Sequence, residues 1–342
     1  MNKLLKKPLQ WLLEGNAEII LASCLFISTI EFILLYSAAK IEGVVFIQEG
    51  VGFLENYGII STLIGDAFLF YLAKKYINSI ILISQNTSLY KNDIIIRKVE
   101  EYKSRVCLED RLQGIYYLFI FIGLTAWIIN VSFHVFGDST QHWGGLVFDS
   151  RDHPLGFMFN RINNFYSWIF VLPTCLYVIT ISSIQFWEII KEASLLRGIK
   201  YDLLNPDKFG GFSFVEKGHI FLNLSIAIIY IQIVSHIITF ELLNLEHILS
   251  YIFITLAFVF GNSFYMSLLN TKIEEMRIKT LNHYKKKIYN NDALSFDIFK
   301  YYQETYSNRS FLSSTNTIVN LMKALSISLP ILIKVLEPLF KT

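Results

Sequence analysis

The sequence predicts an all-α fold, a polytopic membrane helix bundle of six to seven transmembrane helices with a helical cytoplasmic layer. Of its 342 residues, 53% are apolar and 17% are charged, whereas a soluble domain carries about 25% charged residues. The mean hydropathy is +0.44. The apolar residues form separate blocks of about 20, the length that spans roughly 30 Å of hydrocarbon. Together these observations predict an integral membrane protein.

Six apolar runs are long enough to cross a bilayer. They lie at residues 17–39, 58–80, 114–136, 165–187, 219–243 and 247–269. Charged residues interrupt a further run, 318–340, which therefore either spans the membrane or lies in the interface. We expect a transmembrane bundle over residues 1–270, followed by a cytoplasmic helical segment over 271–317.

The distribution of Lys and Arg predicts the orientation. The N-terminal segment and the links 74–113, 188–218 and 270–317 hold three, eight, five and eight of them. The three intervening links hold one, two and none. Because cationic side chains are retained in the cytoplasm, the N-terminus and the long links are predicted to be cytoplasmic. The chain is thus expected to be a multi-pass protein of the plasma (inner) membrane.

The cytoplasmic links themselves show helical periodicity. In the link 84–113, Ile95, Val99, Tyr102 and Val106 recur every three to four residues, which predicts a helix leading directly into the third span. The same spacing continues after the sixth span, from Ile273 onward. The simplest interpretation is that the third and sixth spans project as helices into the cytoplasm. The other cytoplasmic link within the bundle is 188–218.

Two acids lie deep within the first two predicted spans. Glu31 is eight residues before the end of the first span, and Asp66 is eight residues after the start of the second. With a rise of 1.5 Å per residue, a hairpin of these spans would place both carboxyl groups roughly 12 Å below the same membrane surface. Ionisable groups at that depth are candidates for a functional site.

Two histidines are predicted near the same depth, His134 at the outer end of the third span and His236 in the fifth. Together with Glu31 and Asp66 they form a candidate ion or proton site in the outer half of the bundle. A divalent metal site is an alternative chemistry, but no His-x-x-x-His or Glu-x-x-His spacing links these four residues, and no metal ligands are assigned. Alternatively, the acids only hold helices together through hydrogen bonds.

The sequence gives weak support to a disulfide framework, a zinc site or a catalytic site. Cys24, Cys107 and Cys175 have no paired spacing, so they predict neither a disulfide framework nor a zinc site. The chain contains no Gly-x-Ser-x-Gly or His-Glu-x-x-His motif. We therefore assign no catalytic residues, regard an enzyme as the third choice, and leave the cofactor unknown.

A compact motif follows the fourth span, in residues 201–212. Its distinctive positions are Asn205, Pro206, Asp207, Gly210 and Gly211. On physical grounds it is a rigid turn, since Pro ends a helix and paired Gly residues allow a close backbone approach; a ligand loop is the alternative.

This motif resembles the His-Pro-Asp-x-x-Gly-Gly signature of an uncharacterised family of bacterial multi-pass membrane proteins, with Asn205 in place of His. The outer-loop sequences His142-Trp143-Gly144-Gly145 and His153-Pro154, and the proline-containing tail around Pro330 and Pro338, are also similar to that family. No activity follows from the resemblance.

The favoured function is a pore or transporter-like protein. The alternative is a non-conducting membrane sensor or assembly scaffold that acts through its basic cytoplasmic helices. The expected partner is the lipid bilayer. For either function, a second copy of the chain and a protein at the cytoplasmic face are possible further partners. The near-neutral net charge of +2 gives no indication of nucleic-acid binding.

Overall fold

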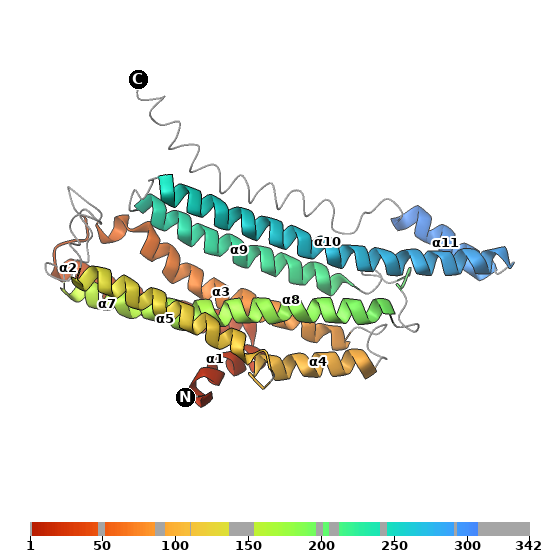
Figure 1. Cartoon of the computed structure of the whole chain (residues 1–342), viewed down its shortest axis with the longest axis horizontal. Coiled ribbons are helices and arrows are strands. Elements are labelled where there is room, and N and C mark those ends of the chain that lie inside the picture. The colour runs from red at the N-terminus through yellow and green to blue at the C-terminus, as the bar shows by residue number, and fades with distance from the viewer. Residues whose placement is uncertain are drawn as a thin grey trace, which may run out of the picture. The chain divides into compact units, whose positions relative to one another are not determined.

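A computed structural model describes residues 2–46, 52–85, 93–109, 111–136, 154–195, 201–204, 212–239, 245–290 and 293–306. All regular secondary structure in these ranges is helical, and none of them contains a strand (Figure 1). The chain divides into two compact units. The all-α prediction is therefore confirmed for the part of the chain that the structure describes.

Unit 1 comprises Met1–Lys75, Ser104–Ile181 and Leu224–Ile248. It contains the N-terminal helices and the elements around the predicted acidic site. These are α1 (Asn2–Glu14), α2 (Ala17–Ile41), η1 (Phe53–Glu55), most of α3 (Tyr57–Ile81), α5 (Gln113–Phe136), α7 (Pro154–Tyr166), the π-helical turn η3 (Ser167–Val171), and the adjoining parts of α8 (Leu172–Leu195) and α9 (Ser213–Thr239).

Unit 2 comprises Tyr76–Lys103, Ser182–Asn223 and Leu249–Thr342. Besides the other parts of α3, α8 and α9, it contains η2 (Leu82–Gln85), most of α4 (Asp93–Val106), most of α10 (Leu245–Tyr289) and α11 (Ala293–Tyr306). Within it, Lys98 of α4 forms salt bridges with Glu101 at 2.8 Å and with Glu188 of α8 at 3.1 Å. The Tyr102 and Ser182 hydroxyls lie 2.7 Å apart. Polar contacts thus hold α4 against α8.

Four helical stretches in the described ranges are long and apolar enough to cross a membrane. They are Ala17–Ile41, Tyr57–Ile81, Pro154–Ser194 and Ser213–Gln232. They coincide with the first, second, fourth and fifth predicted spans. Gln113–Ile128, in the third predicted span, is a shorter apolar helix. The structure supports a membrane-embedded helical protein and does not confirm the count of six to seven, and residues 318–340 lie outside the described ranges.

Several predicted boundaries differ from the structure. The expected continuous helix into the third span is wrong, because α4 ends at Val106, Leu108 has a φ of 59°, and α5 begins at Gln113. A left-handed backbone at a leucine breaks the helix there. The helix of the fourth span begins at Pro154, eleven residues before the predicted start. By contrast, α10 continues without interruption from the predicted sixth span to Tyr289, as expected.

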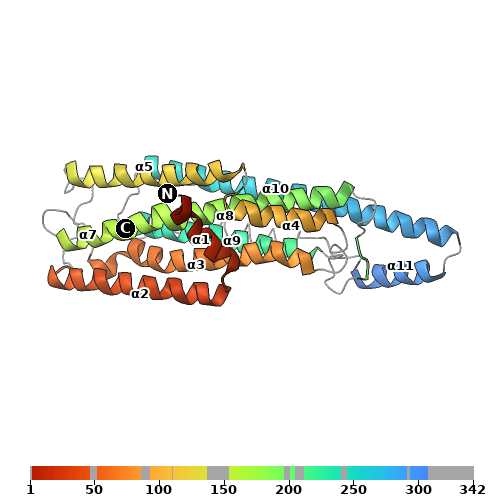
Figure 2. The same cartoon turned by 90° about the horizontal axis from the view of Figure 1, so that it is seen from below.

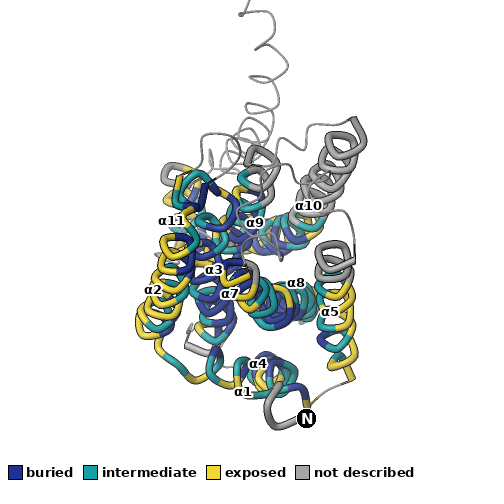
Figure 3. The backbone as a smooth tube through the Cα atoms, turned by 90° about the vertical axis from the view of Figure 1, so that its left-hand side faces the viewer, coloured by how far each residue is buried: buried dark blue, intermediate teal, exposed yellow. Residues whose placement is uncertain are grey.

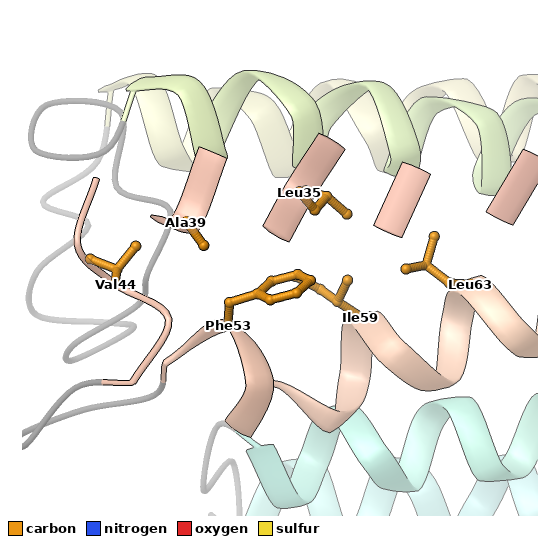
Figure 4. Close-up of a cluster of buried hydrophobic side chains, with 6 residues drawn as sticks. All are labelled: Leu35, Ala39, Val44, Phe53, Ile59 and Leu63. Carbon is orange, nitrogen blue, oxygen red and sulfur yellow. The ribbon is translucent and has the colours of Figure 1, made fainter. Parts of the chain in front are cut away.

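The α2–α3 hairpin is closed by a small apolar core. Its buried members are Leu35, Ala39, Val44, Phe53, Ile59 and Leu63 (Figure 4). Phe53 of η1 lies between the two helices in this view and is fully buried. α2 also packs along α7 (Figure 2). These contacts fix the helices that carry Glu31 and Asp66.

Exposed residues run along α2 and α5 (Figure 3). Many of them are large and apolar. On α2 they include Ile19, Phe26 and Ile33, with exposed fractions of 63%, 67% and 55%. On α5 they include Phe121 and Ile122. A soluble protein rarely exposes such continuous apolar faces. Helices with these surfaces are suited to contact with lipid.

Candidate functional site

The side-chain contacts of α2 and α3 set the relative depth of the two acids. The Ser28 hydroxyl donates a hydrogen bond to the Leu63 carbonyl at 2.7 Å, so these two residues lie near one level. Glu31 and Asp66 each lie three residues beyond that level, and the antiparallel helices carry them in opposite directions. At 1.5 Å per residue they are offset by about 9 Å along the helices. The backbone positions of the two acids are therefore offset along the hairpin, and because helical side chains tilt toward the N-terminus, the two carboxyl groups lean toward each other.

Asp66 is the most enclosed acid of the candidate site. Its side chain is 4% exposed. The Ser167 hydroxyl donates a hydrogen bond to Oδ2, and Gln232 Nε2 donates one to Oδ1 at 3.0 Å. Both donors are neutral, and among the described residues no Lys, Arg or His side chain pairs with Asp66. In the described ranges, the Asp66 carboxyl is thus held by neutral donors alone.

Ser167 begins the π-helical turn of the long helix that continues as α8. The Leu172 amide donates to the Ser167 carbonyl, five residues back. Pro173 follows immediately, and it has no N–H for the carbonyl four residues before it. A widened turn in front of a proline accommodates the ring and the freed carbonyl. π turns occur frequently at functional sites, and this one presents the hydroxyl that meets Asp66.

Gln232 reaches Asp66 from α9 because α3 has a glycine one residue earlier. A Cβ added at Gly65 would lie 2.5 Å from Gln232 Nε2 and 3.0 Å from its Cδ. Such distances are shorter than van der Waals contact. The missing side chain at Gly65 therefore lets the amide lie against α3 and donate to the neighbouring carboxylate.

Glu31 has a different environment from Asp66. Its side chain is half-buried, and among the described residues it has no hydrogen-bond or ion-pair partner. It does interact electrostatically with Asp66 as a like charge, and both acids interact in the same way with the Tyr166 side chain. Glu31 thus lies close enough to Asp66 to be affected by its charge.

Some predicted site residues lie outside the described parts of the structure. His134 falls within α5 and His236 within α9, one turn beyond Gln232, but their side chains are not among those described. The cytoplasmic motif at Asn205, Pro206, Asp207, Gly210 and Gly211 lies wholly outside the described ranges. Their roles stay predictions.

The site contains two donors that the sequence did not single out for this role. Gln232 was noticeable only as an amide inside an apolar run. Ser167 resembled the other hydroxyls of the fourth span, such as Ser182 and Ser183. The Pro173 that follows the serine was the one available signal, since proline marks an irregular helix.

The chemistry of this cluster is that of a carboxyl group with neutral hydrogen-bond donors. In the described ranges, no group of three His, Cys, Asp or Glu side chains is placed to hold a metal ion. A carboxyl group in a low-dielectric interior can bind a proton, or a cation that replaces it. Either step changes the charge of the cluster by one unit.

Comparisons with known proteins add no assignment. No protein-family model, curated protein or solved structure matches this chain. In its described ranges the chain is all-helical, with four helices long and apolar enough to cross a membrane.

Proposed function

We propose that the protein is a pore or transporter-like membrane protein in which Asp66 binds and releases a proton or a small cation. One observation carries this proposal. Asp66 lies in a helix able to span the membrane, is 4% exposed, and is held by the neutral donors Ser167 and Gln232. Intramembrane acids of this kind are costly and mark ion or proton pathways.

Neutral donors suit reversible binding better than a salt bridge would. A lysine or arginine beside Asp66 would favour a permanently ionised carboxylate, because the opposite charge stabilises that state. Ser167 and Gln232 stabilise the carboxylate through hydrogen bonds but carry no charge of their own. A proton or cation can then neutralise Asp66 without displacing a bound side-chain cation.

Glu31 has a secondary role in this proposal. Its electrostatic interaction with Asp66 means that ionisation of one carboxyl disfavours ionisation of the other. The offset of the two groups along the hairpin makes Glu31 the acid nearer the Glu42 end of α2. We infer that Glu31 tunes the occupancy of Asp66.

Flux through proteoliposomes tests the proposal. Proton and alkali-cation flux would be followed with ion-sensitive dyes for the native chain, Asp66→Asn and Glu31→Gln. We expect Asp66→Asn to lower the flux by about tenfold or more, because an amide cannot exchange a proton or balance a cation. Glu31→Gln should change the rate less and shift its pH profile.

Glu18→Gln is the matched control. Glu18 is an acid on the same helix, but it is exposed and paired with Lys75 at 2.9 Å. Its replacement should leave flux near the native rate. Equal flux in the native chain and in Asp66→Asn, or no flux in the native chain above protein-free liposomes, contradicts the proposal.

A membrane sensor or scaffold is the second candidate. The supporting observation lies in unit 2, where the end of α10 exposes three consecutive lysines, Lys285, Lys286 and Lys287. A basic cluster of this kind can contact anionic lipid or an acidic partner. If the native chain conducts nothing, charge-dependent binding at these lysines becomes the function to test.

A further inference from the structure

One face of α7 carries buried polar side chains that end at Asp66. Asn160, Asn163 and Ser167 are separated by three and four residues, so they lie on the same side of the helix. Their exposed fractions are 9%, 3% and 1%. Ser167 is the member that donates to Asp66. The face therefore leads from the Pro154 end of α7 to the acid.

The two asparagines have unsatisfied hydrogen-bonding groups. Neither Nδ2 nor Oδ1 of Asn163 has a hydrogen-bond partner, and Oδ1 of Asn160 has none among the described residues. A buried polar group without a partner costs about 1–3 kcal/mol. Native proteins commonly satisfy such groups with internal water. An amide that is both donor and acceptor is suited to bind water on either side.

The spacing of these groups fits a chain of water molecules. Asn163 lies about 6 Å along the helix from Ser167, and Asn160 about 10 Å. Polar groups separated by 5–6 Å can be bridged by one water, since each hydrogen bond spans about 2.8 Å. The Glu42 carboxylate marks the far end of this face, where it accepts from the Leu155 and Gly156 amides.

We propose that Asn160 and Asn163 hold water molecules that connect Asp66 with the Pro154 end of α7. This inference deepens the function proposed above and rests on it, since it names the route by which a proton or small cation reaches Asp66. The asparagines act as positioning residues. They bind the water and do not themselves exchange a proton.

Silver-ion labelling of introduced cysteines tests the route without measuring conduction. Asn163→Cys and Asn160→Cys would be prepared separately in the full chain in unsealed membranes. Ag⁺ displaces the thiol proton to water and forms a silver thiolate, which requires water at the side chain. Peptide mass spectrometry would report labelling at each position, so that the native cysteines can stay in place.

The matched control is Ile162→Cys. Ile162 neighbours Asn163 in sequence and depth, but its side chain is 57% exposed on an apolar face suited to lipid. We expect cysteines at 160 and 163 to react at least about tenfold faster than the cysteine at 162, because a thiol in hydrocarbon stays protonated. Monodisperse elution would establish that each variant is folded.

Equal or slower labelling at 160 and 163, compared with 162, in folded protein overturns the water route. Labelling is measured at both 160 and 163 so that a local structural defect at one position does not decide the outcome. Labelling at 160 and 163 together with unchanged flux in Asp66→Asn would retain the route and reject the proposed function. Loss of flux in Asp66→Asn without labelling at 160 and 163 would retain the proposed function and reject the water route.

Discussion

At the scale of single residues, two carboxylates of unit 1 serve different purposes. Asp66 accepts hydrogen bonds from side chains inside a span. Glu42, at the end of α2, accepts from the backbone amides of Leu155 and Gly156 at 2.7 and 3.1 Å. These amides belong to the first turn of α7, where no intrahelical acceptor is available. Pro154 precedes them and has no amide to satisfy.

Replacing Glu42 by Gln should destabilise the start of α7. An amide offers one oxygen and loses the favourable interaction of a negative charge with a helix N-terminus. The expected loss is about 1 kcal/mol of unfolding free energy, which is typical for a helix cap. Thermal unfolding of the purified protein in detergent would measure it. An unfolding midpoint equal to that of Glu18→Gln, a change at an exposed ion pair, would show that the cap does not stabilise the protein.

The sequence identified Asp66 but not its partners, for a physical reason. An acid in an apolar run is visible locally, because it is costly there. Ser167 and Gln232 come from helices 101 and 166 residues further along the chain. Which helices become neighbours depends on three-dimensional packing, and the periodicity of one helix does not contain that information.

At the scale of helices, the π turn and α5 approach each other closely. Gly123 of α5 lies against the backbone of Trp168, and a Cβ added to this glycine would overlap the Trp168 carbonyl oxygen. Trp127 Nε1, one turn further along α5, donates to the Arg161 carbonyl of α7 at 3.2 Å. Small residues commonly permit such backbone contacts between membrane helices.

Gly123→Ala should therefore destabilise the protein by about 1–3 kcal/mol, the usual cost of overpacking. Gly114→Ala is a control on the same helix, since a Cβ there meets no atom within 4 Å. That change should be neutral or stabilise the helix by up to about 1 kcal/mol, because alanine is the better helix former. Thermal unfolding and limited proteolysis would compare the two. Similar midpoints for both variants would contradict the close contact.

Helix ends were predicted accurately where hydropathy dominates the local sequence. The α2–α3 hairpin was predicted to within two residues at each end. The start of α7 was missed because the link 137–163 as a whole is rich in Gly, Asp and His. The cap of α7 is Glu42, more than a hundred residues away. The break after α4 was missed because Leu108, with its positive φ, has no compositional signature.

At the scale of the whole molecule, the alternating charge of the links is the argument for orientation. The links with many Lys and Arg are predicted to face the cytoplasm. Cys107 lies between α4 and α5 in one of these links and is a native reporter. Ser139 lies in a link predicted to face outward.

Maleimide labelling in sealed cells would test this orientation. A membrane-impermeant maleimide should label Ser139→Cys from outside and reach Cys107 only after permeabilisation. Burial raises the pKa of the Cys107 thiol, so its labelling in permeabilised cells should be slow at neutral pH and accelerate as the pH rises through the ordinary thiol range. Labelling of Cys107 in intact cells would reverse the predicted orientation.

The widened turn at Ser167–Val171 has a consequence for how this helix tolerates changes in length. A π turn is the form that one surplus residue takes inside an α-helix, with the flanking segments still facing their original neighbours. Deleting one residue from this turn would leave the faces of α7 and α8 as they are, but Pro173 would then lie in regularly wound helix. A one-residue change at this turn would fall beside the hydroxyl group that contacts Asp66.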